Sequence, residues 1–169
     1  YACYEKNNYN LLKSGRQWFG KKIHQKDFDT TFVFSNLETT SPVKLKIQVA
    51  SRAASQKYFS LTVNEQAIGM ISLPGVVLSN FTGVHATQKS ALYTFSENSS
   101  QFNVKLTYNN TGNRDEEGYL DYITINARRK ISMAGDLLLF RDRTYTGNSA
   151  VARYTVENCN ENTEIWDVT

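Results

Sequence analysis

The stretch that decides the fold is Gly118-Tyr-Leu-Asp-Tyr-Ile-Thr-Ile-Asn-Ala-Arg-Arg129. It is rich in the β-branched and aromatic residues that strands favour. Alternation along a strand predicts one face made of Tyr119, Asp121, Ile123, Ile125 and Ala127. It predicts an opposite face made of Leu120, Tyr122, Thr124 and Asn126. Because neither face is simply polar, we expect a central strand of a sheet rather than an edge strand.

The rest of the chain alternates in a similar way, most clearly where Val43, Leu45, Ile47 and Val49 are separated by polar residues. The inward residues expected in two further runs are Phe59, Leu61 and Val63, and Phe102, Val104, Leu106 and Tyr108. The predicted strands before the opening stretch are Phe28–Phe34, Val43–Ala50, Tyr58–Val63, Ala67–Leu73, Ala91–Phe95 and Phe102–Tyr108. A short turn at residues 64–66 predicts a hairpin. Short strands, turn signals and no helical pattern indicate an all-β, jelly-roll-like antiparallel β-sandwich.

The chain divides most naturally near residue 130. Residues 1–130 carry the sandwich pattern, and residues 131–169 form a C-terminal extension. We expect a β-hairpin in this extension, because it contains three further strand-like runs. These runs are Leu137–Arg141, Ala150–Val156 and Thr163–Val168.

Composition limits the kinds of partner. The net charge is only +3, and the one dense basic cluster is Arg128-Arg129-Lys130 at the end of the opening stretch. A nucleic-acid-binding protein would carry a larger basic stripe, so we expect no nucleic-acid partner and a solvated strand end here.

No apolar run approaches 18 residues, so we expect no membrane-spanning helix. Tyr1 opens a polar stretch without a signal peptide, which suggests a mature or trimmed chain.

The two cysteines, Cys3 and Cys159, lie near opposite ends of the chain. Termini often lie close together in a domain, so a disulfide between them is one interpretation. It would stabilise the fold by about 4–5 kcal/mol in the chain-entropy model. Two unpaired thiols fit the sequence equally well.

Catalytic and metal-binding chemistry is weakly marked. A thiol nucleophile needs a base beside it, but Cys159 has no local signature that pairs it with His24 or His85. The acidic loop Asn113–Glu117 with Asp121 offers oxygen ligands for calcium, although its spacing does not match an EF-hand loop and Arg114 would repel a cation. We therefore expect a solvated acidic loop, a structural Asp121, and no catalytic residue, metal or cofactor.

Aromatic residues provide the best candidates for surface contacts. Trp18, Tyr122 and Trp166 are those we expect to contact a ligand or partner, since sugar-binding sites use exposed aromatic rings. Packing in the core or on a sheet face is the alternative for each. A free-standing carbohydrate-binding module is therefore one candidate function.

Two resemblances to known families add to these inferences. Val43–Ser51, Phe59–Asn64 and Tyr119–Ala127, with the run Leu-Asp-Tyr-Ile, resemble the strand series of galactose-binding-type jelly rolls. This resemblance concerns the fold and says little about a ligand.

The second resemblance spans most of the chain. Its motifs are Ser14-Gly-Arg-Gln-Trp-Phe-Gly20, Leu120-Asp-Tyr-Ile123 followed by Arg128-Arg129, Phe140-Arg141, and Ile165-Trp-Asp-Val-Thr169. In this order they resemble the N-terminal, non-catalytic region of PorU-type proteins, the gingipain-like cysteine peptidases of type IX secretion in Bacteroidetes. One departure from the family pattern is Gln17. It is inserted between Arg16 and Trp18, where we would expect a continuous Gly-Arg-Trp run.

The PorU resemblance implies an exported protein at the cell surface, associated with the outer membrane. The parent protein would be a peptidase that removes the sorting domain of secreted cargo and helps to attach the cargo to lipopolysaccharide. The expected partners are the peptidase domain absent from this chain, an outer-membrane β-barrel protein and cargo sorting domains. This chain would be a non-catalytic accessory or docking domain. If residues 131–169 pack on the peptidase domain, Trp166 and Leu137–Phe140 should be exposed here.

Overall fold

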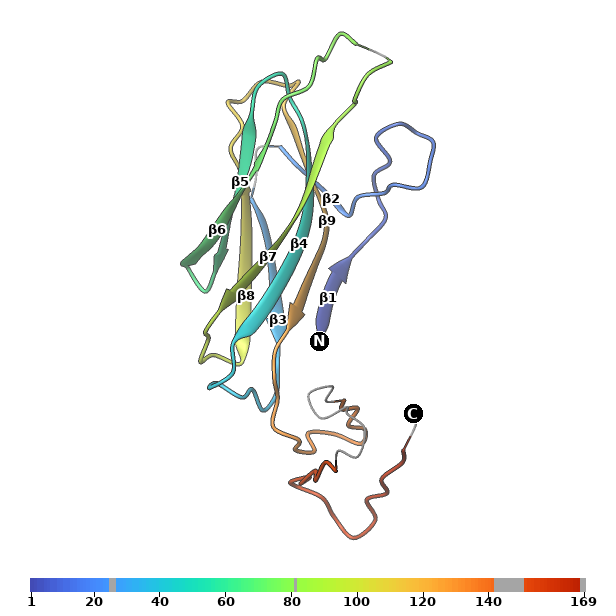
Figure 1. Cartoon of the computed structure of the whole chain (residues 1–169), viewed down its shortest axis with the longest axis vertical. Helices are drawn as coiled ribbons and strands as arrows, with labels where there is room; N and C mark the ends of the chain where they lie inside the picture. The colour runs from blue at the N-terminus through green and yellow to red at the C-terminus, as the bar shows by residue number, and fades with distance from the viewer. Residues whose placement is uncertain (25–26, 81, 142–150, 168–169) are drawn as a thin grey trace.

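The computed structural model describes residues 1–24, 27–80, 82–141 and 151–167. Two antiparallel sheets form a β-sandwich, which confirms the predicted fold class (Figure 1). The described residues contain no helix long and apolar enough to span a membrane. The strands are β1 (Ala2–Glu5), β2 (Lys21–Ile23), β3 (Phe28–Val33), β4 (Val43–Arg52), β5 (Lys57–Val63), β6 (Gln66–Leu73), β7 (Thr87–Phe95), β8 (Gln101–Tyr108) and β9 (Glu117–Asn126).

The five-stranded sheet is built around β9, as the opening stretch predicts. Its order is β1-β9-β4-β7, and β2 pairs with the first part of β9 on the same side as β1. Strand β4 pairs with the other side of β9 along almost its full length. A strand with neighbours on both sides has its backbone polar groups satisfied in the sheet, which explains why β9 can be apolar on its inner face.

The four-stranded sheet has the order β3-β8-β5-β6. The β5–β6 hairpin predicted from the turn at residues 64–66 is confirmed. Asn64 and Glu65 have φ values of 48° and 67°, the left-handed values that a tight two-residue hairpin turn requires. The strand ends agree with the sequence patterns to within a few residues.

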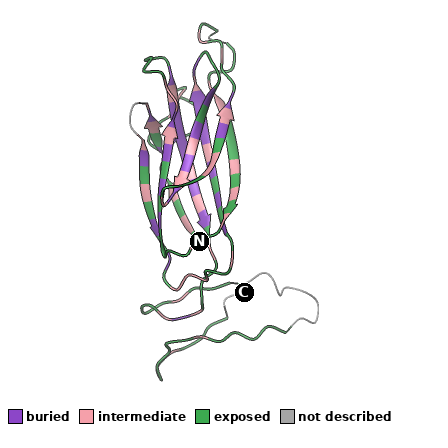
Figure 2. Ribbon diagram, turned by 90° about the vertical axis from the view of Figure 1, so that its left-hand side faces the viewer, coloured by how far each residue is buried: buried purple, intermediate pink, exposed green. Residues whose placement is uncertain are grey.

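The core lies between the two sheets (Figure 2). The predicted inward residues of β4, β5 and β8 are all buried, since alternation places every second side chain on the apolar face. Fully buried side chains from both sheets meet there: Leu45, Ile47, Phe59, Leu61, Ile71, Leu73, Phe102, Leu106, Leu120, Ile123 and Ile125.

Two sequence predictions about the chain ends are wrong. Strand β1 occurs in a stretch where no strand was expected, because Asn7 and Asn8 interrupt any pattern around it. The expected C-terminal hairpin is absent from the described residues of 131–169, which hold only an isolated parallel bridge between Ser132 and Glu157. The apolar runs in this extension have no partner strand among the described residues, so strand-like composition alone does not produce a sheet. Ala150 and Val168, the ends of two predicted strands, lie outside the described residues.

The C-terminal segment lies beyond the end of the sandwich at which β9 ends (Figure 1). Hydrogen bonds attach its first residues to the sandwich: Lys130 N donates to Asn36 O at 2.8 Å, and the Asn36 side-chain amide donates to Ser132 O at 3.1 Å. Beyond this contact most of the described side chains are exposed.

Candidate functional site

A β-bulge at Asp121 determines which side chains of β9 reach the surface. Gln48 of β4 pairs with Tyr122 and Val49 pairs with Leu120, so Asp121 is an extra residue in β9. A bulge turns two consecutive side chains toward the same side. Leu120, Ile123 and Ile125 therefore point into the core, whereas Asp121 and Tyr122 lie on the outer face of the sheet. The predicted alternation, with Asp121 and Ile123 on one face, is wrong for this reason.

Asp121 is held by a network of side-chain amides. Its Oδ2 accepts hydrogen bonds from Gln17 Nε2 and Gln48 Nε2, both at 2.8 Å. Gln48 Oε1 in turn accepts a hydrogen bond from Ser90 Oγ, also at 2.8 Å. Burial raises the pKa of Asp121 above its ordinary value, the neighbouring Glu5 adds to that shift, and the two amides oppose it. Asp121 is thus satisfied by hydrogen bonds, but its donors are glutamine side chains and not the backbone amides or arginine that we expected of a structural aspartate.

Gln17 reaches Asp121 because the segment between β1 and β2 folds over the outer face. Phe19 is buried there against Ala50 and Tyr119, in a small apolar cluster separate from the main core. Gly20 N donates to Leu120 O at 2.8 Å, and a Cβ on Gly20 would lie 3.2 Å from Asp121 O. The close approach of the two backbones at Gly20 fixes the segment against β9.

Trp18 and Tyr122, two of the predicted contact residues, lie on this outer face. Trp18 stands between Gln17 and the buried Phe19, and 42% of it is exposed. Tyr122 is half-buried, and Lys46 Nζ lies 5.7 Å from the centre of its ring. The neighbours of Trp18 in the chain are thus anchored and Tyr122 is half-buried, while part of each aromatic side chain stays in contact with solvent.

Trp166, the third predicted contact residue, lies apart from these two in the C-terminal segment and is 77% exposed. Other large apolar side chains of that segment are also exposed: Leu137, Leu139, Phe140, Val151, Tyr154 and Ile165. This exposure is what we expected if residues 131–169 pack on another domain.

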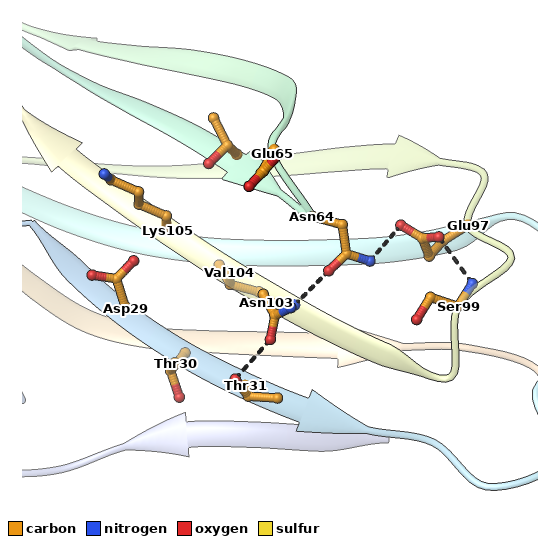
Figure 3. A pocket seen from close by; sticks show the side chains of 11 residues that line it. Asp29, Thr30, Thr31, Asn64, Glu65, Glu97, Ser99, Asn103, Val104 and Lys105 are labelled. Atoms are coloured by element: carbon orange, nitrogen blue, oxygen red, sulfur yellow. Dashed lines mark hydrogen bonds between the residues drawn. The ribbon is translucent and has the colours of Figure 1, made fainter.

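A hollow lies on the opposite side of the molecule, on the outer face of the four-stranded sheet (Figure 3). Its volume is about 800 Å³. The sequence analysis did not identify it, because single polar residues on alternating strand positions look like ordinary solvent-facing positions. Its lining residues are Asp29, Thr30, Thr31, Thr62, Asn64, Glu65, Glu97, Ser99, Asn103, Val104 and Lys105.

Hydrogen bonds fix several side chains of this hollow. Asn64 Nδ2 donates to Glu97 Oε2 at 2.8 Å, and Ser99 N donates to Glu97 Oε1 at 2.9 Å. These bonds, the one from Ser99 foremost, hold the pKa of Glu97 below its ordinary value. Thr31 Oγ1 donates to Asn103 Oδ1 at 2.9 Å. The hollow is polar and has no aromatic ring among its lining residues, so it offers no stacking surface.

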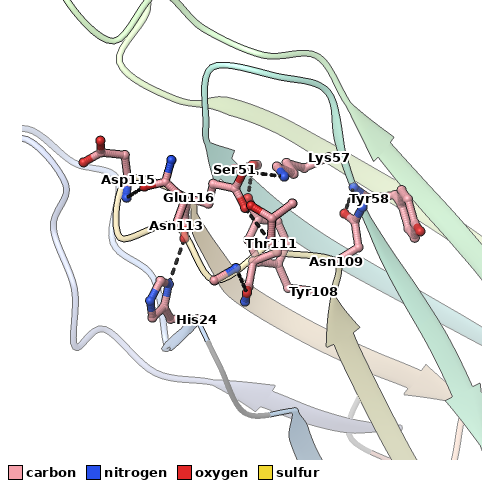
Figure 4. Close-up of polar contacts among 12 residues, drawn as sticks. His24, Ser51, Lys57, Tyr58, Tyr108, Asn109, Thr111, Asn113, Asp115 and Glu116 are labelled. Atoms are coloured by element: carbon pink, nitrogen blue, oxygen red, sulfur yellow. Dashed lines mark hydrogen bonds and ion pairs between the residues drawn. The ribbon is translucent and has the colours of Figure 1, made fainter.

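A buried ion pair lies at the end of the sandwich where β9 begins (Figure 4). Lys57 Nζ and Glu116 Oε1 are 2.6 Å apart, with both side chains almost fully buried. Glu116 Oε2 accepts a hydrogen bond from Thr111 N at 2.6 Å. Burial opposes ionisation of Glu116, but the bonds from Lys57 and Thr111 outweigh it and hold its pKa below the ordinary value.

These contacts correct the two interpretations of the acidic loop. Glu116 is buried and paired with Lys57, and Glu117 is paired with Lys22, so the loop is not simply solvated. The same carboxylates would have been needed for calcium, and lysines occupy them instead. Among the described residues no group of three or more His, Cys, Asp or Glu side chains is arranged to hold a metal ion.

The cysteines and histidines do not form a catalytic pair. His24 follows Ile23, which pairs with Gly118 at the start of β9, and His85 precedes β7 at the same end of the sandwich. Cys159 lies in the C-terminal segment, beyond the other end of β9. The Cys159–His24 and Cys159–His85 pairs are therefore excluded in this structure by the length of the sandwich. Cys3 and Cys159 are both exposed and free, the second of the two alternatives for these thiols.

Comparison with known proteins reveals similarity at the level of fold. The sequence matches no protein-family model and no curated protein. Dimeric latent PorU from Porphyromonas gingivalis is similar to this chain with a TM-score of 0.66 and 16% identity. The similarity covers 79% of this chain but only 13% of the PorU chain. At this identity the likeness establishes a shared sandwich fold with a region of PorU and no shared activity.

Carbohydrate-binding modules show a weaker likeness. The CBM36-1 domain of a xylanase from the Trinervitermes trinervoides hindgut metagenome has a TM-score of 0.47 and 12% identity, over 73% of this chain and 85% of that one. A CBM36 module in complex with calcium and xylotriose has a TM-score of 0.41 and 12% identity, over 63% of this chain and 80% of that one. These scores are too low to support an argument about ligands.

Proposed function

We propose that this chain is a non-catalytic accessory domain of a PorU-type protein. The observation that carries the proposal is the fold likeness to a region of PorU, with a TM-score of 0.66 over 79% of the chain. The order of the sequence motifs supports it, because Ser14–Gly20, Leu120–Ile123 and Ile165–Thr169 follow one another as in that family. Gln17, the one departure in these motifs, is used inside the fold as a donor to Asp121.

The C-terminal segment supports a docking role. The core of the sandwich is complete without it, since the core residues all belong to residues 23–125. Its own apolar side chains remain exposed, among them Leu139 and Trp166, each at 77%. Exposed apolar side chains grouped in one segment are typical of a surface that another domain covers. In the proposed protein the covering domain is the peptidase domain of the same polypeptide.

The role of the parent protein follows from the same proposal. It would process and attach the cargo of type IX secretion at the cell surface, in association with the outer membrane. The present domain would hold the peptidase domain in position and contribute a surface for the β-barrel partner or for cargo sorting domains. Rigid β-sandwiches suit this task because their two sheets keep distant surface residues at fixed separations.

The proposal is tested by binding and by processing in cells. The tagged chain is used as bait for the peptidase domain, the β-barrel partner and a cargo sorting domain. We expect capture of the peptidase domain, and loss of capture when Leu139→Asp and Phe140→Asp are combined. The control combines Val33→Asp and Met70→Asp, which change exposed apolar side chains on the sandwich. Failure to capture any of the three, together with normal cargo processing after deletion of residues 1–130 from the parent, would overturn the proposal.

A further inference from the structure

The outer face of the five-stranded sheet carries a regular array of side chains. The strand register places Glu5, Tyr122, Gln48 and Ser90 in one row across the sheet. The next row consists of Cys3, Thr124, Lys46 and Leu92, and the row after it contains Asn126, Lys44 and Thr94. We call the side chains of β9, β4 and β7 in these three rows the Tyr122 face.

Tyr122 supplies an aromatic surface at one corner of this face, in its first row and on β9. Its ring is half-buried and flanked by Gln48 and Thr124, whose side chains are half-buried as well. Gln48 is held by bonds to Asp121 and Ser90, so its position is fixed before any ligand arrives. A fixed ring beside amides and hydroxyls combines an apolar contact with directed hydrogen bonds, which is what a sugar ring offers in return.

The lower part of the face is positively charged. Lys46 and Lys44 are exposed on β4, and Lys46 Nζ lies 5.7 Å from the Tyr122 ring centre. Lys44 also lines a hollow of about 350 Å³ together with Ser41, Pro42, Asn126, Ala127 and Arg128. Ammonium, guanidinium, hydroxyl and amide groups around one hollow are suited to a carboxylate, sulfate or phosphate group. Tyr122 and Asn126 are four strand positions apart, about 13 Å.

The opposite face of the sandwich has the reverse character. Its hollow contains Asp29, Glu65 and Glu97, and its one lysine, Lys105, is paired with Asp27 at 2.6 Å. The hollow of that face therefore differs in charge from the hollow at Lys44. Glu5 and Asp121 place negative charge beside Tyr122, so an anionic group of a ligand is attracted to the Lys44 and Lys46 end of the Tyr122 face and is repelled from the hollow of the opposite face.

We propose that the Tyr122 face binds an acidic oligosaccharide. One sugar ring lies over Tyr122, taking the place that the Lys46 ammonium group now occupies. Gln48, Ser90 and Thr124 hydrogen-bond to its hydroxyls, and Lys46 moves toward a neighbouring negative charge. A further anionic group of the ligand enters the hollow at Lys44. This site is independent of the docking role proposed above, because it lies on the sandwich and not on the C-terminal segment.

The test is an array of neutral, uronic-acid, sulfated and phosphorylated oligosaccharides, followed by calorimetry of the strongest ligand. We expect retention of acidic oligosaccharides only, with an affinity that falls several-fold as salt is raised. Tyr122→Ala should weaken binding by about 10-fold, and Lys44→Gln and Lys46→Gln by about 3–10-fold each with a smaller salt dependence. Tyr58→Ala and Lys105→Gln, on the opposite sheet, are the matched controls and should bind normally.

Thermal unfolding separates loss of binding from loss of folding. Tyr122→Phe keeps the aromatic ring and should bind, and the lysine substitutions change exposed side chains that the core does not need. Three results would overturn the proposal: no acidic oligosaccharide is retained, neutral ones bind equally well, or the control variants lose as much affinity as the variants of the Tyr122 face. A protein partner in place of a glycan would give the first of these results.

Discussion

Gln17 Nε2 donates a 2.8 Å hydrogen bond to Asp121 Oδ2, joining residues that are 104 positions apart in the chain. Asp121 is the extra residue of the β9 bulge, and Gln17 belongs to the segment that folds over the outer face of the sheet. The bond therefore fixes this segment at the one point where β9 departs from regular pairing. It also places Trp18 beside the sheet.

Replacement of Gln17 should lower the stability of the domain. Gln17→Ala leaves the partly buried carboxylate of Asp121 with one amide donor in place of two, so we expect a loss of about 1–2 kcal/mol in the free energy of unfolding. Urea denaturation measures it. Gln56→Ala is the control, because Gln56 donates to Ser72 Oγ at an exposed site. A loss no greater than that of the control would show that the bond has no structural role.

Neutralisation of Asp121 should have the opposite sign at neutral pH. The pKa of Asp121 is raised in the folded protein, so its charge destabilises the fold above that pKa. This penalty fades as pH falls through the folded pKa toward the unfolded value. Asp121→Asn keeps an oxygen that can accept from Gln17 and Gln48 without the charge. We expect the variant to be at least as stable as the wild type at pH 7 and to lose any advantage near pH 3.

The comparison of two substitutions makes this prediction specific. Asp121→Ala removes the acceptor for both glutamine amides and should destabilise the domain by about 1–3 kcal/mol at every pH. Chemical denaturation from pH 3 to pH 8 distinguishes the two variants. Equal destabilisation by Asn and Ala at pH 7 would contradict the assignment of burial as the main influence on Asp121.

The Lys57–Glu116 pair should be costly to break on one side only. Lys57→Met leaves the Glu116 carboxylate buried without its counter-ion, and we expect a loss of about 3–5 kcal/mol. The double variant Lys57→Met with Glu116→Leu should recover part of this loss, since no buried charge remains. Calorimetric unfolding of Lys57→Met, Glu116→Leu and the double variant gives the coupling free energy between the two side chains. If the two single losses of stability simply add in the double variant, the result would argue against a buried pair.

The lowered pKa of Glu116 also predicts how the free energy of unfolding changes at low pH. Its pKa is lowered in the folded protein from the ordinary value of 4.5, so its ionised form stabilises the fold above that value. The contribution is lost as pH falls from 4.5 through the folded pKa. Glu116→Gln should therefore show a shallower loss of stability than the wild type below pH 4.5. Parallel pH profiles for the two proteins would refute this prediction.

Gly118 should not tolerate a side chain. A Cβ at this position would lie 2.7 Å from the Tyr108 ring and 2.9 Å from the Phe59 ring, and both rings are buried. Gly118→Ala should cost about 1–3 kcal/mol because the packed rings have to move. Gly135→Ala, where nothing lies within 4 Å, is the matched control and should be close to neutral. A neutral Gly118→Ala variant would mean that this part of the core is loosely packed.

The two tryptophans should report on the two ends of the molecule. Trp166 is 77% exposed and Trp18 is 42% exposed. In the Trp18→Phe variant all tryptophan fluorescence comes from Trp166. Its emission maximum should lie at longer wavelength, and acrylamide should quench it more strongly, than in the Trp166→Phe variant. Addition of the peptidase domain should shift the emission of Trp166 to shorter wavelength and protect it from acrylamide, and should leave the emission of Trp18 unchanged. A blue-shifted Trp166 in the isolated chain would show that the C-terminal segment already packs there.

The pattern of alternating residues was sufficient to predict most strands. Strands β3 to β8 follow from runs in which every second residue is apolar, because a sheet with one face on a core and one in solvent imposes that period. Strand β9 follows from its β-branched and aromatic composition. The same rule failed at β1, whose four residues are stabilised by pairing with β9 and not by their own pattern. It also failed for the C-terminal runs, whose apolar residues have no partner strand among the described residues.

The sequence by itself determined the fold class, the inner residues of β4, β5 and β8, and the exposed aromatics as candidates, because these depend on local composition and on a period of two. Only the tertiary structure decided which face of β9 Asp121 and Tyr122 occupy. A bulge depends on the register between β9 and β4, and register is a property of two strands together. The Gln17–Asp121 bond and the burial of Glu116 against Lys57 have the same origin. They arise from contacts between residues far apart in the chain, which the folded backbone alone brings together.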